Sequence, residues 1–313
     1  MSAKPRIDQR VAYVYVAMQN LAEGRPLNEI AEELGISRFA AARMVRRARE
    51  LGLIEVRAVV DDPVEVDLSA RLARRYGLES AIVVATPSTG VADVRAALAA
   101  VAARFFVEHA VEDDVVGMTP GRTSVAMSRC VEQLPWLDVV QLTGVGDPNL
   151  ANGVEAILNI GRMSGGATFP LYAPIFVPDG QKEGILRHPA NARTVQRFSA
   201  VTAAYLTIGG WPDASLLATQ VAEVGEMDRF ADRDVVAEIG TVLLDSSGRS
   251  ISGFEDLIVG IGEDATRAIP LRVAVGGGAD KARAVRAVLD SGIAQVVITD
   301  AHSASLALDA AAD

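Results

Sequence analysis

The sequence predicts an α/β protein with two parts: an N-terminal winged helix-turn-helix over residues 1–60, and a doubly wound, mostly parallel α/β domain over residues 61–313. Three observations predict this fold class. Glycines separate short helical patterns in the first 60 residues, apolar strands alternate with helices in the rest, and 313 residues suit one small domain plus one larger domain. Since hydrophobic residues make up 50% of the chain, the larger part can bury a sizeable core.

The first two helices follow from the spacing of apolar residues and from end signals. Gly24 ends the first helix, and Pro26 suits the first turn of the second. The first helix carries one apolar stripe with steps of 4, 3, 4 and 3, made of Ile7, Val11, Val14, Met18 and Leu21. The inner face of the second helix comprises Leu27, Ile30, Ala31 and Leu34.

A tight turn joins the second helix to a third helix, which runs to Leu51. Gly35 suits the left-handed conformation that ends a helix, and Ile36 anchors the turn. Ser37 can accept a backbone N–H as the N-cap of the third helix. This spacing is typical of a helix-turn-helix, in which the third helix lies across the second.

An alternating segment ends the first domain. Residues 53–59 predict a strand or wing, and the Asp-Asp-Pro run at 61–63 breaks it. The charge changes at the same place: residues 1–60 hold ten Lys and Arg against seven Asp and Glu, whereas residues 61–313 hold 20 against 33. An acidic body with a basic head would be repelled by DNA everywhere except where the head docks.

The third helix has a basic outer face that suits DNA. There are five arginines and no acid between residues 38 and 49, and the core face comprises Ala41, Met44, Val45, Ala48 and Leu51. A guanidinium can bind guanine as a fork, and the N-terminal residues of a recognition helix point at bases. The predicted contacts are Arg38, Ala42 and Arg43 to bases, Arg46 and Arg47 to phosphates, and Ser37 to a phosphate or as the cap. The alternatives are a solvated basic face or a helix-turn-helix that contacts only protein.

Strands alternate with helices in the second part, which predicts a mostly parallel sheet covered on both faces. Helices are expected over residues 67–76, ended by Gly77, and over residues 91–110. Strands are expected over residues 81–85, 115–118, 139–142, 203–208, 240–244, 271–275 and 295–299. Residues 149–193 give no clear pattern.

Two strand-to-helix loops suit the binding of an anion. Residues 117–123 offer backbone N–H groups, hydroxyls and the cation Arg122 at the start of a helix. Residues 276–281 repeat the scheme, with Lys281 in the first helical turn. A lysine there opposes the helix dipole, which indicates an anionic partner. The alternative is that the glycines of these loops serve only tight packing.

These motifs resemble the SorC family of sugar-responsive regulators, which includes the deoxyribonucleoside and central glycolytic gene regulators. The similar segments are residues 30–38 and 43–54 in the head, then 117–123 (Gly-Val-Ser-Trp-Gly-Arg-Thr in the family), 241–245, 276–281 and 297–300. The resemblance covers nearly the whole chain and keeps the order of the motifs. It implies a sheet related to sugar-phosphate isomerases, double-stranded operator DNA as a partner, a sugar-phosphate or related effector, and a homodimer or homotetramer.

The resemblance also implies the effector-binding residues. The phosphate would be held by Thr119, Arg122, Thr123 and Lys281, with Gly117 and Gly121 in the first loop. Asp245 and Gln141 or Gly144 would face the sugar, and Asp300 is a further candidate. Two of these residues have a structural alternative, because Asp300 can cap a helix or serve packing and Asp245 can be a turn residue.

The chain departs from the family pattern in several segments. These are Ala40–Ala42, Thr119 with Pro120, residues 203–207, and Ala237. Neither the operator sequence nor the ligand is therefore carried over from the family.

Composition disfavours several other classes of protein. Cys130 is the single cysteine, so there is no disulfide framework, and His109, His188 and His302 lie far apart, so we expect no metal site and no cofactor. No apolar run approaches the ~18 residues that a membrane span needs. We therefore expect a cytoplasmic protein without a membrane partner.

An enzyme is the alternative function. A sugar-phosphate isomerase or deaminase could use the same fold, with Lys281 and Asp245 as acid and base. The basic head disfavours this alternative, because an isomerase gains nothing from a DNA-binding surface. We therefore expect a regulator and not an enzyme.

Overall fold

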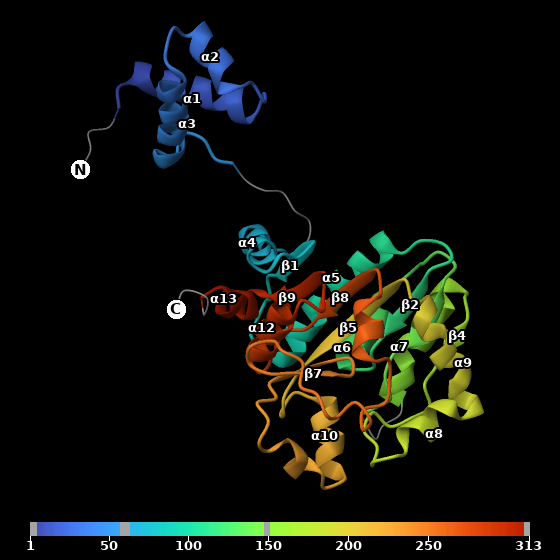
Figure 1. Cartoon of the computed structure of the whole chain (residues 1–313). Helices are drawn as coiled ribbons and strands as arrows, with labels where there is room; N and C mark the ends of the chain where they lie inside the picture. Colours follow the sequence, from blue (N-terminus) through green and yellow to red (C-terminus); the bar gives the residue numbers. More distant parts are fainter. Residues whose placement is uncertain (1–4, 57–62, 147–150, 310–313) are drawn as a thin grey trace. The chain divides into compact units, whose positions relative to one another are not determined.

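The chain divides into two compact units, Met1–Asp61 and Asp62–Asp313 (Figure 1). The structure is a computed structural model that describes residues 5–56, 63–146 and 151–309, except for the side chains of residues 151–153. None of the helices in these ranges is both long enough and apolar enough to cross a membrane.

The described part of the first unit contains three helices, α1 Ile7–Leu21, α2 Leu27–Glu33 and α3 Arg38–Glu50. The predicted turn between α2 and α3 is confirmed. Gly35 has a φ of 64°, which favours glycine. The hydroxyl of Ser37 accepts a hydrogen bond of 3.1 Å from the backbone N–H of Ala40, so this serine is the N-cap of α3.

The apolar stripe of α1 does not face the core of this unit. The core contains Val16, Ile30, Ala31 and Ala41, whereas Ile7, Val11, Met18 and Leu21 are exposed. The physical reason is that α1 packs on α3 through small side chains: Ala17 of α1 is completely buried, as are Ala41 and Ala48 of α3. The close approach of the two helices selects the face of α1 that carries Val16 and Ala17.

The predicted wing is not found where the structure describes it. Residues 53–56 form no strand, and residues 57–59 lie outside the described residues. A strand needs a partner for its backbone groups, and the described part of this unit contains no strand to pair with. Over residues 53–56 the sequence alternation therefore did not indicate a strand.

The second unit is built on a sheet with the order β1-β9-β8-β5-β2-β3-β4, in which all neighbours are parallel. A short antiparallel hairpin, β6 and β7, extends from β5. The strands are β1 Ser80–Val84, β2 Val115–Met118, β3 Asp138–Gln141, β4 Thr168–Phe169, β5 Ala203–Gly210, β6 Ala237–Ile239, β7 Val242–Leu244, β8 Leu271–Val275 and β9 Val296–Asp300. The strand predicted at 240–244 is confirmed as β7, but it begins only at Val242, because Gly240 has a φ of 63° and turns the chain between β6 and β7.

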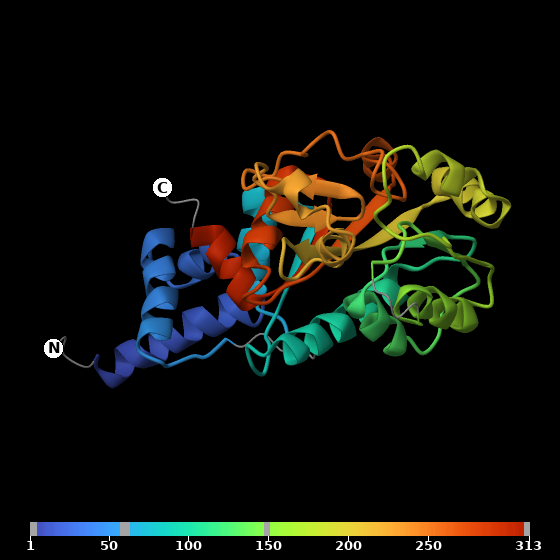
Figure 2. The same cartoon turned by 90° about the horizontal axis from the view of Figure 1, so that it is seen from below.

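Helices cover both faces of this sheet (Figures 1 and 2). One face packs against α4 Val66–Tyr76, α12 Ala282–Ser291 and α13 Ala301–Asp309, and the other against α5 Val91–His109, α6 Arg122–Arg129 and α7 Ala151–Ser164. The remaining helices are α8 Lys182–Arg187, α9 Pro189–Arg197, α10 Leu216–Glu223 and α11 Glu263–Arg267, with 3-10 turns at Phe198–Ala200 and Met227–Phe230. The doubly wound architecture is thus confirmed.

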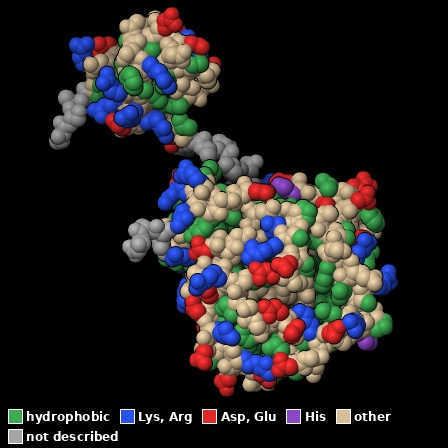
Figure 3. Space-filling model, viewed as in Figure 1, with side chains coloured by type: hydrophobic (Ala, Val, Ile, Leu, Met, Phe, Trp, Pro, Cys, Tyr) green, Lys and Arg blue, Asp and Glu red, His purple; other side chains and the backbone are tan. Residues whose placement is uncertain are grey.

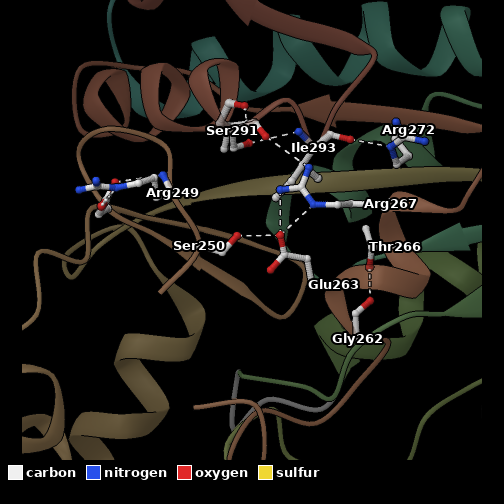
Figure 4. Close-up of polar contacts among 11 residues, drawn as sticks. Arg249, Ser250, Gly262, Glu263, Thr266, Arg267, Arg272, Ser291 and Ile293 are labelled. Atoms are coloured by element: carbon white, nitrogen blue, oxygen red, sulfur yellow. Dashed lines mark hydrogen bonds and ion pairs between the residues drawn. The ribbon is translucent and has the colours of Figure 1, made fainter. Parts of the chain in front are cut away.

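A network of hydrogen bonds holds the connection between β7 and β8 against the end of α12 (Figure 4). The guanidinium of Arg267 binds Glu263 at 2.8 Å and donates to the carbonyl of Ser291 at 3.3 Å. The Glu263 carboxylate also accepts from the hydroxyl of Ser250 at 2.7 Å. Arg272, near the start of β8, donates to the carbonyl of Ile293 at 2.6 Å. These contacts fix the start of β8, the strand whose other end leads into the loop at 276–281.

Asp300 holds the end of β9 to the loop that follows β8. Its carboxylate is 2% exposed and accepts from the backbone N–H groups of Gly278 (2.7 Å), His302 (3.0 Å) and Ser303 (3.1 Å), and from the Ser303 hydroxyl (2.7 Å). It therefore joins a sheet loop to the first turn of α13. The structure supports the cap alternative for Asp300, since all of its accepting capacity serves this joint.

We predict that Asp300→Ala destabilises the second unit by several kcal/mol, because the loss leaves buried N–H groups without an acceptor at about 1–3 kcal/mol each. The matched control is Asp309→Ala, an exposed aspartate at the other end of α13. Thermal and urea unfolding of the two variants would measure the difference. Equal unfolding midpoints for the two variants would contradict this role.

Candidate functional site

A polar cleft lies at the edge of the sheet where β2, β3, β5 and β8 end. The empty space within it amounts to about 830 Å³, a value that includes open solvent at its mouth. Its wall includes residues from the segments that follow β2, β3 and β8 (119–123, 143–146 and 277–281) and residues 207–209 near the end of β5. In parallel sheets the carboxyl ends of the strands are where ligands bind.

Three cations from three different helices line the cleft. Arg122 is the first residue of α6, Arg95 lies in α5, and Lys281 is the N-cap of α12. Neither arginine has an ion-pair partner among the residues that the structure describes, and the Lys281 ammonium donates to the carbonyl of Ile208 at 2.7 Å. Burial lowers the pKa of Arg95, and the charge of Arg122 lowers it further. Burial also lowers the pKa of Lys281, although Asp280 and Glu238 oppose this shift. A bound anion would relieve the repulsion among these cations.

Neutral donors and two carboxylates, Glu238 and Asp280, line the rest of the cleft. The Thr119 hydroxyl lies 3.0 Å from that of Thr207 and accepts from the Thr207 N–H at 2.8 Å. Glu238 accepts from the Ser215 hydroxyl at 2.5 Å and from the Leu216 N–H at 3.2 Å. Burial raises the pKa of Glu238, although the Ser215 bond opposes the shift. Hydroxyls beside a carboxylate suit a ligand that carries several hydroxyl groups.

The structure brings six of the ten predicted effector residues to this cleft. They are Thr119, Gly121, Arg122, Thr123, Gly144 and Lys281. Gly144 has a structural reason as well, since a Cβ there would lie 2.3 Å from the carbonyl oxygen of Pro174. The four predicted residues that do not line the cleft are Gly117, Gln141, Asp245 and Asp300.

Packing and local hydrogen bonds explain why Gly117, Gln141 and Asp245 do not line the cleft. Gln141 is completely buried, and its amide donates to the carbonyl of Thr143 at 2.8 Å. A Cβ on Gly117 would lie 2.7 Å from a methyl group of Leu142, so this glycine permits tight packing. Asp245 accepts from the hydroxyl of Ser247 at 2.6 Å, which holds the pKa of its carboxyl well below the usual range. Asp245 is thus a turn residue, and the acid-base pair of Asp245 with Lys281 is not formed.

Two cleft residues, Arg95 and Glu238, did not emerge from the sequence. Arg95 lies in the second turn of an alanine-rich helix, where a single arginine reads as a solvated residue. Glu238 follows Ala237, a position already noted as a departure from the family pattern. That departure was the available signal for Glu238.

The basic face of α3 is exposed in part (Figure 3). Arg38, Arg43 and Arg46 are exposed, whereas Ala42 and Arg47 are half-buried. Arg47 also binds Glu50 at 2.9 Å. With Ser37 acting as the N-cap, the arginines of α3 that are exposed to a partner are therefore Arg38, Arg43, Arg46 and Arg49.

Comparison with known proteins identifies similar regulators. The chain is 27% identical over 285 residues to the deoxyribonucleoside regulator of Bacillus subtilis, which covers 88% of this chain and 90% of that protein. It is 28% identical over 305 residues to the erythritol catabolism regulatory protein EryD of Brucella abortus, with 92% and 93% covered. These matches extend over both units.

The fold is also that of a solved structure. The full-length sorbitol operon regulator SorC of Klebsiella pneumoniae has a TM-score of 0.70 and 18% identity, with 96% of this chain and 99% of that chain covered. The family model described as "Putative sugar-binding domain" matches residues 64–309, which include every element of the cleft. The resemblance to SorC regulators is thereby confirmed, and the chain belongs to this family of sugar-binding domains.

Proposed function

We propose that this protein is a transcription regulator of a carbohydrate catabolism operon, and that a phosphorylated sugar or polyol in the cleft controls its binding to operator DNA. The observation that carries the proposal is the convergence of Arg95, Arg122 and Lys281 on one cleft in a chain that also has a helix-turn-helix with an arginine face. The proposal is supported by relatives that are named as regulators and that match this chain over most of its length.

The charge of the cleft favours a phosphorylated ligand over a neutral sugar. A phosphate monoester is close to a dianion at neutral pH, and it can accept charge-assisted hydrogen bonds from several cations at once. Arg122 is the first residue of α6, so the backbone N–H groups at the N-terminus of this helix are further donors to the anion. The threonine hydroxyls and Glu238 would then bind the hydroxyls of the sugar or polyol.

The working unit is proposed to be an oligomer. One recognition helix reads too few bases to select a genomic site, and two-fold operators pair with two-fold proteins. The exposed apolar row of α1 supports this proposal, because its spacing of 4, 3, 4 and 3 is that of a coiled-coil seam. Ligand binding would change the relative placement of the DNA-binding heads in the oligomer.

A screen for the effector comes first. Thermal unfolding would be followed against a panel of sugars, polyols and their phosphates, because a ligand at a hundred times its Kd stabilises the protein by roughly 2.7 kcal/mol. We expect phosphorylated compounds to raise the Tm and the corresponding neutral sugars to have little effect. Conversion of any of these compounds between aldose and ketose forms would support the enzyme alternative instead.

We predict that Arg95→Ala, Arg122→Ala and Lys281→Met each weaken effector binding by roughly 1.5–3 kcal/mol, because each removes a charge-assisted contact to the anion. Operator binding without effector should remain. The matched control is Arg129→Ala at the other end of α6, which binds Glu155 away from the cleft. Calorimetry and an operator shift assay would separate the two activities, and wild-type effector affinity in all three cleft variants would place the anion site elsewhere.

We predict that Arg46→Ala weakens binding to all DNA sequences and lowers the salt slope of binding by about one unit, because a phosphate contact is lost. Arg43→Ala should relax base specificity at a cost of ~1–3 kcal/mol. Arg71→Ala in α4 is the control, since this arginine is exposed and lies in the second unit. Unchanged operator binding by a folded double variant of Arg43 and Arg46 would reject the assignment of DNA binding to α3.

We also predict that light scattering at micromolar protein detects a dimer or tetramer. Val11→Glu with Met18→Glu, which places charges on the exposed row of α1, should shift the assembly toward smaller species and weaken operator binding. Since both residues are exposed, the helical content measured by circular dichroism should stay the same. A wild-type protein that is monomeric with and without operator would refute the oligomer.

A further inference from the structure

Phe39 is an aromatic residue on the outside of the helix-turn-helix. Its side chain is 82% exposed in the first turn of α3, the largest exposed fraction among the large apolar residues that the structure describes. Ala41 and Ala48 of the same helix are completely buried. The ring therefore belongs to the outer face of α3 and contributes nothing to the core of the unit.

Phe39 lies at the centre of that outer face. Successive residues of a helix are 100° apart, so Phe39, Arg43 and Arg46 form one row directly opposite the face of Ala41 and Ala48. All three side chains of the row are exposed. If Arg43 and Arg46 bind in the major groove of DNA, the phenyl ring of Phe39 also lies in that groove. The ring belongs to the N-terminal turn of α3, the part of a recognition helix that contacts the base edges.

The chemistry of the groove selects a single contact for such a ring. A phenyl group cannot form hydrogen bonds with phosphates or with the polar edges of adenine, guanine and cytosine. Thymine, in contrast, presents an apolar C5 methyl group in the major groove. Burial of that methyl against an exposed ring removes apolar surface of both from water. Single exposed apolar residues are common on proteins, but a ring in one row with two exposed arginines on a recognition helix is placed for a ligand.

We propose that Phe39 is a specificity-determining residue that recognises thymine in the operator through its C5 methyl group. This inference rests on the proposed DNA-binding function of α3. It adds an apolar reader to the arginines, and it requires at least one thymine beside the bases or phosphates that Arg43 and Arg46 contact.

The experiment uses the full chain and DNA selected by it from a random pool. Each thymine of the selected site is replaced in turn by deoxyuridine, which removes only the methyl group, and affinity is measured for wild type, Phe39→Ala and Phe39→Leu. The matched control is Val224→Ala, which truncates an exposed apolar residue (53% exposed) in the second unit. Circular dichroism and light scattering of each variant show whether the head stays folded and the assembly unchanged.

We expect deoxyuridine at one or more thymines to weaken wild-type binding about fourfold, the effect of one buried methylene-sized group. The same substitution should have no effect on Phe39→Ala and a reduced effect on Phe39→Leu, whereas Val224→Ala should respond like wild type. If Phe39→Ala fails to fold, the comparison of wild type with Phe39→Leu still decides the matter.

Three results would overturn the inference. No deoxyuridine penalty at any thymine, or an equal penalty in wild type and both Phe39 variants, would mean that the ring does not read the methyl group. A change of oligomeric state in Phe39→Ala with unchanged penalties would make the ring a contact between copies of the chain. If the full chain selects no DNA at all, the DNA-binding function itself fails, which is a different outcome from any of these.

Discussion

The parallel arrangement of the main sheet is the constraint on which the cleft depends. Because β2, β3, β5 and β8 run in the same direction, their carboxyl ends meet at one edge, and each strand continues there into a loop. Arg95, Arg122 and Lys281 are far apart in the sequence, yet this edge brings them to one cavity. Their mutual repulsion is unfavourable in the free protein, so the arrangement favours the binding of an anion.

The frame around the cleft is held by contacts that do not touch it. Asp300 ties the loop after β8 to the start of α13, and Arg267 with Arg272 ties the start of β8 to the end of α12. Both ends of β8 are therefore fixed, which limits the positions available to Lys281. The carbonyl of Ile208 further holds the Lys281 ammonium. A site fixed by its surroundings loses little conformational freedom when a ligand binds.

The two units divide the charge of the chain as well as its structure. The acidic second unit carries the cleft, and the small first unit carries the arginines of α3. With only three helices described, the first unit has a small core that relies on alanine, so it leaves Phe39 and much of the apolar side of α1 exposed. These exposed apolar groups are explained if they contact DNA or a second copy of the chain.

The sequence by itself determined the local elements and most of the loops of the cleft. Gly35 and Ser37 specify the turn before α3, and runs such as residues 271–275 specify strands, because caps, turns and side-chain periodicity act within a few residues. Short elements such as β4 and α8 contain too few residues to show a periodic pattern of apolar side chains. Only the tertiary structure decided that Val16 faces the core in place of the α1 stripe, that Asp300 and Gln141 serve internal hydrogen bonds, and that Arg95 and Glu238 join the cleft. The physical reason is that the partner of a side chain is set by contacts between segments distant in sequence, which no local pattern records.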